Sequence, residues 1–190
     1  CPLYNSMNKH LEPVFEILLP ALEEAKIEYW VYGGISVASV AGRFHRRNND
    51  VDIFVLEEDF QRAKETLEKI SDESFPEKQK LWRQKFEIKK DNAKLTMISI
   101  KRRGDTVIFL FGDKEKVYPS RILQKIERNI AGFRFFTTTD EYIRIMLKDY
   151  LKLRELLPLK KTKVKIPVDA HAILSNEDCI ECLRRPIWYF

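Results

Sequence analysis

Apolar residues along the chain follow two spacings, one typical of helices and one typical of strands. Residues 8–26 place apolar side chains at helical spacing, which predicts an N-terminal helix interrupted by prolines. Short aromatic and β-branched runs at 29–32 and 50–56 predict two strands. We expect a short helix at 35–41 between these strands and a longer helix at 58–70 after the second strand.

Three further runs, at 85–89, 95–100 and 106–111, have the composition of strands. Between them lie Asp91-Asn92 and Arg103-Gly104-Asp105, which are residue types typical of turns. Strands joined by such short turns pair antiparallel, so this part of the chain predicts a meander.

The segment at 71–79 is polar, contains Pro76 and is predicted to be a loop. After the meander we expect a helix at 120–129 and a strand at 133–136. Thr139 or Asp140 then caps a helix that Pro158 ends. Two short helices, at 168–174 and 176–184, complete the expected elements.

This order of elements predicts an α/β (α+β) fold built on a mixed sheet with a helical C-terminal part. We expect residues 1–137 to form the core together with the N-terminal helix. Residues 138–190 are expected to form a helical segment packed on that core.

Composition and cysteine usage favour a globular protein in a reducing compartment. Of the 190 residues, 44% are hydrophobic and 33% charged, which suits a globular domain, and no apolar stretch is long enough for a transmembrane helix. The three cysteines, Cys1, Cys179 and Cys182, form no disulfide framework, and the first residues do not resemble a secretory signal. We therefore expect a cytoplasmic location and no membrane association. The Cys179/Cys182 pair is assigned to helix packing, with a zinc or redox role as the alternative.

The chain carries a net charge of +5 and has a pI near 9.0. An excess of positive charge favours anionic partners such as nucleotides or RNA. Basic residues are dense between Arg144 and Lys165. That run is either an RNA-binding surface or a solvated helix face and loop.

Asp50 and Asp52 are the first candidates for chemistry. Residues two apart on a strand point to the same face, so both carboxylates project together while Val51, Ile53 and Val55 pack behind them. Such a pair repels unless a cation neutralises it, and Mg²⁺ is commonly held by one or two carboxylates plus substrate phosphates. An Asp-x-Asp pair at the edge of a strand is also compatible with a structural role.

Gly33-Gly34 stands where the first strand passes into a helix. Glycines there allow backbone amides to approach a phosphate, the start of a helix favours an anion, and Ser36 adds a hydroxyl. A tight turn is the alternative interpretation of Gly33-Gly34 alone. A glycine pair ending one strand and an acidic pair beginning the next place phosphate contacts and metal ligands at the same edge of the sheet.

Together, Gly33-Gly34, Gly42-Arg43-Phe44, Arg46 and Asp50-Val51-Asp52 resemble the nucleotidyltransferase superfamily related to DNA polymerase beta. Within it, the likeness is greatest to the aminoglycoside and lincosamide adenylyltransferases and to uncharacterised small nucleotidyltransferases. The specific match covers residues 29–56, and the remainder agrees only in general layout.

The resemblance implies a magnesium-dependent enzyme that uses a nucleoside triphosphate, with ATP as the first candidate. Asp50 and Asp52 would bind one or two Mg²⁺ ions, and Gly33, Gly34 and Ser36 would hold the triphosphate. An acceptor hydroxyl would then attack the α-phosphorus and pyrophosphate would leave. Arg46 would contact phosphate or brace its loop, and a solvated or acid-paired Arg46 is the alternative.

The resemblance also implies a third carboxylate on a later strand, and here the sequence departs from the family pattern. The expected strand at 106–111 contains no acid, whereas Asp105 precedes it and Asp113 follows it. We assign Asp113 to this role because Gly112 lets the chain bend toward the metal. Asp105 and the absence of any third acid are the alternatives.

Three functional hypotheses follow. The first is transfer of a nucleotide to a small molecule, for which a basic C-terminal half disfavours cationic aminoglycosides. The second has RNA or a protein as the acceptor, as in toxin–antitoxin nucleotidyltransferases. The third is a non-catalytic relative that binds a nucleotide or a protein partner.

Overall fold

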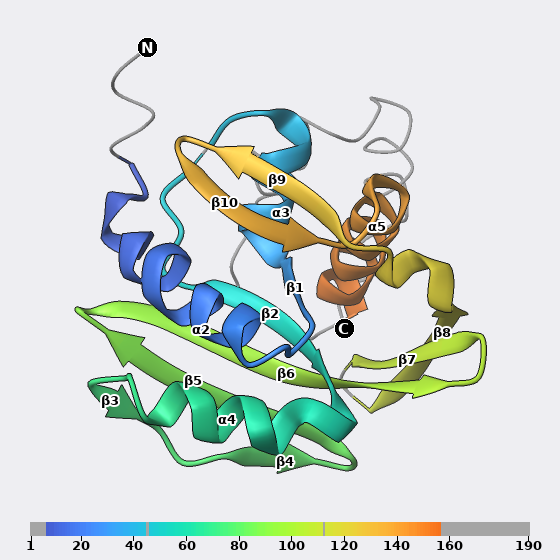
Figure 1. The fold of residues 1–190 in the computed structure, drawn as a ribbon. Coiled ribbons are helices and arrows are strands. Elements are labelled where there is room, and N and C mark those ends of the chain that lie inside the picture. The colour runs from blue at the N-terminus through green and yellow to red at the C-terminus, as the bar shows by residue number, and fades with distance from the viewer. Residues whose placement is uncertain (1–6, 45, 112, 157–190) are drawn as a thin grey trace.

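A mixed sheet with helices packed on both faces forms the framework of the protein (Figure 1). The computed structural model describes residues 7–44, 46–111 and 113–156. The strands are β1 (Tyr29–Tyr32), β2 (Val51–Leu56), β3 (Glu73–Ser74), β4 (Lys78–Lys80), β5 (Arg83–Lys90), β6 (Ala93–Arg103), β7 (Thr106–Phe111), β8 (Lys114–Pro119), β9 (Ile126–Ile130) and β10 (Phe133–Thr137). The α-helices are α2 (Leu19–Glu24), α3 (Gly33–Ala41), α4 (Phe60–Glu68) and α5 (Asp140–Leu156), with 3-10 turns at Lys9–Leu11, Glu57–Asp59 and Ser120–Leu123 and a π-helical turn at Val14–Leu18.

Strand β2 lies inside the sheet, whose main path runs β3-β5-β6-β2-β1-β10-β9. It pairs antiparallel with β1 and parallel with β6. Strand β4 extends the sheet beyond β5, and the β7–β8 hairpin continues from the end of β6. The two strands that carry the glycine pair and the acidic pair are therefore direct neighbours.

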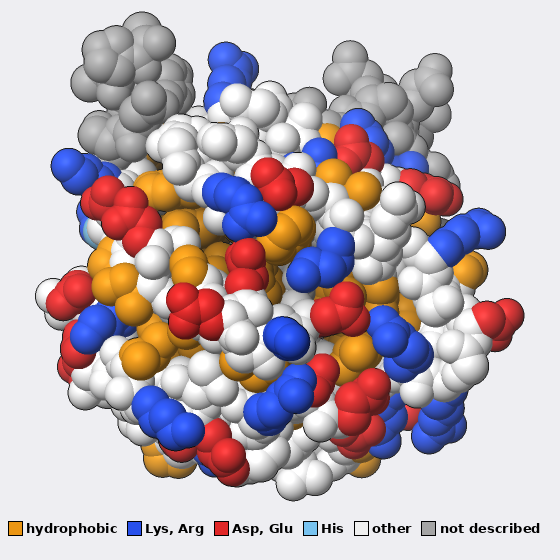
Figure 2. All heavy atoms as spheres, viewed as in Figure 1, with side chains coloured by type: hydrophobic (Ala, Val, Ile, Leu, Met, Phe, Trp, Pro, Cys, Tyr) orange, Lys and Arg blue, Asp and Glu red, His pale blue; other side chains and the backbone are white. Residues whose placement is uncertain are grey.

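Alternating side chains of β2 enter two separate cores. Val51, Ile53 and Val55 pack with α2 and α4 in the larger core. Phe54 and Leu56 belong to a second core on the other face, in which Tyr142 of α5 is fully buried. Figure 2 shows the face over α2 and α4, on which acidic and basic side chains are intermixed.

The predicted fold class is confirmed by the mixed sheet, and the strands at 29–32, 50–56 and in the meander are present. Asp91 and Asn92 both adopt positive φ, as a tight hairpin between β5 and β6 requires.

Two predicted segments are wrong. The loop expected at 71–79 contains β3 and β4, whose polar side chains are exposed because both strands lie at the edge of the sheet. The helix expected at 120–129 is a 3-10 turn followed by β9, because Ile126–Ile130 pairs with β10 in a hairpin. Ala131 and Gly132 turn that hairpin with positive φ.

The predicted helix after residue 139 is present as α5, and the Thr139 hydroxyl accepts a hydrogen bond from the Tyr142 amide at 3.4 Å. Within the described residues, no helix has the length and apolar character needed to cross a membrane. The helices predicted at 168–174 and 176–184, the Cys179/Cys182 pair and the C-terminal half of the basic run lie outside the described residues.

Candidate active site

We call Gly33-Gly34, at the junction of β1 and α3, the glycine corner. The pairing of β1 with β2 brings this corner against Asp52. Tyr32, the last residue of β1, lies opposite Asp52, so Gly33 follows directly beside that carboxylate. Gly33 has a φ of +70°, and a Cβ built on it would lie 3.0 Å from Asp52 Oδ2. Glycine is needed here because the backbone is left-handed and because the acidic side chain approaches so closely.

Gly34 is in contact with the loop that precedes β2. A Cβ at this position would lie 2.3 Å from Arg46 Nη2 and 2.3 Å from Asn48 Oδ1, which is inside their van der Waals radii. The absence of a side chain at Gly34 therefore lets the Arg46 guanidinium reach the start of α3. No side chain caps α3, whose first residues are Gly33 and Gly34.

Asn8 and His10, which sequence analysis did not select, hold the loop before β2 through hydrogen bonds. The buried Asn8 side chain accepts a hydrogen bond from the Asn48 amide at 2.7 Å and donates one to the Arg46 carbonyl at 3.3 Å. His10 Nε2 lies 2.9 Å from the Asn48 carbonyl oxygen. No local pattern signals this role, since Asn8 and Asn48 are 40 positions apart.

Ser36 is buried beneath the glycine corner. Its hydroxyl donates to the Gly33 carbonyl at 2.9 Å. In this arrangement Ser36 holds the first turn of α3 in shape.

Asp50 and Asp52 project from the same face of the sheet. The Asp50 side chain is 32% exposed, lies 4.0 Å from Lys94 Nζ and is within 3.5 Å of the Thr96 hydroxyl. Burial, followed by the negative charge of Asp50, raises the pKa of Asp52 from 3.8 to about 7. Burial and the neighbouring Asp52 also raise the pKa of Tyr32, whose ring stacks on Phe54 with centroids 3.8 Å apart.

These residues fit a magnesium ion and a triphosphate in two respects. Asp50 and Asp52 lie on one face, and burial disfavours the ionised form of Asp52. Carboxylate oxygens are ligands that Mg²⁺ prefers, and a bound cation would stabilise the ionised form. Beside them is a corner that a Cβ would fill. Within the described residues, no three His, Cys, Asp or Glu side chains form a metal-binding group, so the protein's own share is the Asp50/Asp52 pair.

A third carboxylate that sequence analysis missed, Glu87, lies on the same face. Thr96 of β6 is opposite Asp52 on one side and opposite Glu87 of β5 on the other, so the three residues form one row across the sheet. Glu87 Oε1 lies 2.7 Å from Lys85 Nζ and 3.0 Å from Lys94 Nζ. The hydrogen bonds from Lys85 and then Lys94 lower the pKa of Glu87 to about 2.

The pairing of Glu87 with Thr96 could have been predicted from the sequence. A hairpin that turns at Asp91-Asn92 necessarily pairs Glu87 with Thr96, so the β5–β6 register follows from the predicted turn. The parallel pairing of β6 with β2 has no such local signal, because β2 and β6 are far apart in the sequence.

The structure does not bring Asp113 to the acidic pair. Strand β7 pairs with β6 and β8 and not with β2, so the turn after it lies elsewhere. The Asp113 side chain is 78% exposed and its carboxylate is 2.7 Å from Lys80 Nζ on β4. Asp105 lies in the turn before β7, where its carbonyl accepts a hydrogen bond from Ser120.

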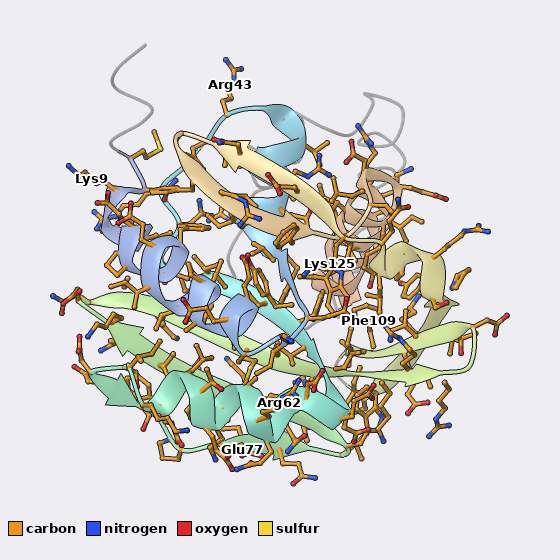
Figure 3. All side chains as sticks on the ribbon, in the orientation of Figure 1. Lys9, Arg43, Arg62, Glu77, Phe109 and Lys125 are labelled. Carbon is orange, nitrogen blue, oxygen red and sulfur yellow. The ribbon has the colours of Figure 1, made fainter. Side chains whose placement is uncertain are left out.

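Two other features lie apart from the site. Arg43 is exposed and points away from the sheet beyond the end of α3 (Figure 3), whereas Phe44 after it is buried. A pocket lined by Phe15, Pro20 and Phe133 opens next to the N-terminal helices and contains none of the site residues.

Comparison of the sequence with family models gives one match that covers more than half of the chain. The sequence model of the aminoglycoside-2''-adenylyltransferase family matches residues 14–119, which include β1, α3 and β2 with the glycine corner and both aspartates. No curated protein gives a significant match.

Several solved structures share the fold. The lincosamide antibiotic adenylyltransferase LnuA, solved with lincomycin, is 17% identical, with a TM-score of 0.58 over 87% of this chain and 94% of that one. ANT(2'')-Ia in complex with adenylyl-2''-tobramycin is 15% identical, with a TM-score of 0.58 over 87% and 88% of the two chains. A Thermotoga maritima protein assigned as a nucleotidyltransferase is 17% identical, with a TM-score of 0.56 over 79% and 88%.

Proposed function

The chain belongs to the aminoglycoside-2''-adenylyltransferase family, and from this membership we propose that it is a magnesium-dependent enzyme that transfers a nucleoside monophosphate to an acceptor hydroxyl. The donor is a nucleoside triphosphate, with ATP as the first candidate, and pyrophosphate is the second product. Nucleotidyl transfer in general follows from the family. The metal, the donor and the site residues are the parts that we propose.

One observation supports the proposal above all others, namely the contact between the glycine corner and Asp52. Gly33 lies directly beside Asp52, so the backbone at the start of α3 and the carboxylate proposed to bind the metal are neighbours. The Arg46 guanidinium contacts Gly34, and backbone amides at a helix start together with a guanidinium favour an anion.

Each residue has a stated task in the proposed reaction. Asp50 and Asp52 hold Mg²⁺, which when bound neutralises phosphate charge and orients the α-phosphorus. Gly33, Gly34 and Arg46 bind the triphosphate, and Ser36 keeps the corner rigid through its hydrogen bond to Gly33. The acceptor hydroxyl approaches from the other side of Asp52, over Thr96.

Glu87 faces that acceptor side. A carboxylate with a pKa of about 2 is ionised throughout the neutral range but is a weak base. We therefore assign Glu87 to orienting the acceptor hydroxyl by accepting its hydrogen bond. Proton transfer from the hydroxyl to Glu87 would be unfavourable until the hydroxyl has begun to bond to phosphorus.

A non-catalytic nucleotide-binding relative is the second candidate function. It is favoured by the fact that Asp50 and Asp52 have no third carboxylate near enough to complete a metal group within the described residues. Such a protein would bind a nucleoside triphosphate with Mg²⁺ and release no pyrophosphate.

The first prediction concerns the acidic pair. We expect the wild-type protein to be stabilised against heat by one or more of the four nucleoside triphosphates only when Mg²⁺ is present, because a ligand that binds the folded state raises Tm. Asp50→Asn and Asp52→Asn should abolish this shift and reduce pyrophosphate release by about 10²–10³-fold, the usual effect of removing one electrostatic contact in an active site. Differential scanning fluorimetry and a pyrophosphate assay measure the two quantities.

Two further variants sharpen this experiment. Glu58→Gln changes an exposed acid in the 3-10 turn after β2 and should leave both readouts unchanged. Asp113→Asn tests the residue that the sequence suggested, and retention of activity would agree with its place beside Lys80. Wild-type protein that is not stabilised by any triphosphate with Mg²⁺ would contradict the proposed function.

A further inference from the structure

The face of the sheet that carries Asp52 is strongly basic on one side of the acidic pair. Cross-strand partners in antiparallel strands have their side chains on the same face. Because Glu87 shares the row of Asp52, every second residue of β5 lies on that face, together with its partners on β4 and β6. We call the resulting group the basic strip; it consists of Lys78, Lys80, Arg83, Lys85, Lys89 and Lys94.

Acids on the described part of this face neutralise only part of the strip. Glu87 is shared between Lys85 and Lys94, and Asp50 lies 4.0 Å from Lys94 Nζ. Glu73 pairs with Lys89, and Asp113 pairs with Lys80. The six bases of the strip thus outnumber these four acids by two. By contrast, the opposite face over α2 and α4 mixes charges of both signs (Figure 2).

The strip is accessible to a ligand. The side chains of Lys85, Lys89 and Lys94 are 34%, 34% and 31% exposed, and all three residues of β4 are exposed. Lysines that keep their ammonium groups in water at this density attract anions.

The strip also lies on the side away from the glycine corner. The corner follows β1, whereas the strip covers β6, β5 and β4 on the other side of β2. With neighbouring strands about 4.8 Å apart, β5 lies about 10 Å and β4 about 14 Å from the strand of the two aspartates. A triphosphate held at Gly33 and Gly34 leaves the strip free for a second molecule.

That second molecule is the acceptor. In phosphoryl transfer the attacking hydroxyl and the leaving pyrophosphate lie roughly in line on opposite sides of the phosphorus. With the leaving group toward β1, the acceptor hydroxyl enters over Thr96 and Glu87, and the rest of the acceptor rests on the basic strip.

We propose that the acceptor is a phosphate-bearing hydroxyl compound whose phosphate is held by Lys85, Lys94 and Lys78, and this inference rests on the function proposed above. The reaction forms a bond between the acceptor oxygen and the α-phosphorus, and it breaks the bond from that phosphorus to pyrophosphate. The hydroxyl proton passes to solvent while Glu87 orients the oxygen. A polyamine such as tobramycin, which ANT(2'')-Ia holds in its adenylylated form, would be repelled by the strip.

Acceptor assays with the full chain, ATP and Mg²⁺ test this inference. The probes are ribose 5-phosphate, a short 5'-phosphorylated oligoribonucleotide, unphosphorylated ribose and tobramycin. We expect pyrophosphate release to be stimulated at least about tenfold more by a phosphorylated probe than by ribose or tobramycin. A steep loss of stimulation with salt, with a logarithmic slope of about −0.7 for each phosphate contacted, identifies the oligonucleotide as the better source, and a shallow loss identifies the small molecule.

Variants of the strip separate the acceptor from the nucleotide. Lys78→Gln and Lys85→Gln should each raise the KM for the phosphorylated probe about tenfold, or about 1.4 kcal/mol in binding free energy. Lys78→Gln, at a residue that does not contribute to the electrostatics of Asp52, should leave the ATP-dependent rise in Tm unchanged. Lys69→Gln, which alters an exposed lysine at the end of α4 on the other face, is the matched control and should change neither value.

The outcomes are distinguishable. A preference for ribose or tobramycin, or an unchanged KM in Lys78→Gln and Lys85→Gln, would contradict the phosphorylated acceptor. If ATP with Mg²⁺ still raised Tm in that case, the proposed nucleotide site would stand. If ATP with Mg²⁺ did not raise the Tm of the wild-type protein, both the proposed function and this inference would be contradicted.

Discussion

Asp52 is a carboxyl group whose negative charge is costly in the folded protein. It is largely buried, stands next to the like charge of Asp50, and has a pKa of about 7 in consequence. A folded protein without metal must therefore either take up a proton at Asp52 or bear the cost of a buried negative charge. A divalent cation bound there as we propose would remove both costs. Rising pH would then lower the stability of the metal-free protein, whereas the metal would raise the stability of the folded protein.

The pH dependence of stability follows from this pKa. Between pH 4 and pH 7 the folded state binds more protons at Asp52 than the unfolded state, whose carboxyl has a pKa near 3.8, so metal-free stability falls as pH rises through that window. Asp52→Asn should recover about 4 kcal/mol at pH 8, raising Tm by about 8–16 °C, and the gain should vanish near pH 4.

Thermal unfolding in EDTA, followed by circular dichroism, measures this difference. Glu58→Gln should keep the pH profile of the wild-type protein. Saturating Mg²⁺ should reverse the order and make the wild-type protein the more stable one. Parallel pH profiles for Asp52→Asn and wild type would show that Asp52 titrates normally.

At the residue scale, the sequence predicted the arrangement of residues that are close together in the chain. Asp50 and Asp52 are two apart at the start of β2 and share a face, and Gly33 and Gly34 follow the end of β1. Glu87 was missed because its role depends on β6 lying between β5 and β2. Asn8 was missed because its partners are in a distant loop.

At the scale of elements, the junction of β1 and α3 tolerates substitution poorly because other side chains pack directly against it. Gly34 is the first residue of α3 with ordinary backbone geometry, and its missing side chain leaves the space that Arg46 and Asn48 occupy. The junction and the loop before β2 therefore form one unit, although twelve or more residues separate them in sequence.

Gly34→Ala should disrupt that unit. The added Cβ would meet two side-chain atoms at 2.3 Å, so we expect the loop to move and the affinity for a nucleoside triphosphate with Mg²⁺ to fall at least about tenfold. Isothermal titration calorimetry measures this affinity. Gly104→Ala is the matched control: its φ of +57° imposes strain of roughly 1–2 kcal/mol, but no atom lies within 4 Å of the added Cβ. Equal affinity in Gly34→Ala and wild type would show that the corner does not hold the nucleotide.

Predicted elements were confirmed where turn chemistry was explicit and wrong where tertiary pairing decided the outcome. Asp91-Asn92 located the β5–β6 hairpin correctly. The segment Ile126–Ile130 mixes polar and apolar residues in a way that also suits a helix, and only its pairing with β10 makes it a strand. The short strands β3 and β4 have almost no apolar signal, because both of their faces are exposed.

At the scale of the whole molecule, the second core joins α5 to the sheet on the same face as Asp52. Tyr142 of α5 is fully buried, with its ring centroid 5.2 Å from that of Phe109 and 5.0 Å from that of Tyr118. Phe109, labelled in Figure 3, also contacts Phe54, which stacks on Tyr32 next to Asp52. A chain of aromatic rings thus runs from α5 to the acidic pair. The division into a core of 1–137 and a segment of 138–190 stays a prediction.

Two substitutions of Tyr142 separate ring packing from hydrogen bonding. Within the described residues, the Tyr142 hydroxyl is buried without a hydrogen-bond partner. Tyr142→Phe should therefore leave the free energy of unfolding unchanged or raise it by about 1 kcal/mol. Tyr142→Ala should lower it by about 3–5 kcal/mol because it leaves a cavity in the second core. Urea unfolding gives both values, and a large loss in Tyr142→Phe would reveal a partner for the hydroxyl.

The position of β2 inside the sheet has a consequence for how such a protein can diverge. Its neighbours β1 and β6 hold it on both sides, so changes to the strand of Asp50 and Asp52 disturb the whole sheet. The lysines of β4 stand on an edge strand whose side chains face water, and substitutions there cost the fold little. Under the function proposed above, mutation and selection can therefore change which acceptor is modified while Asp50 and Asp52 are kept.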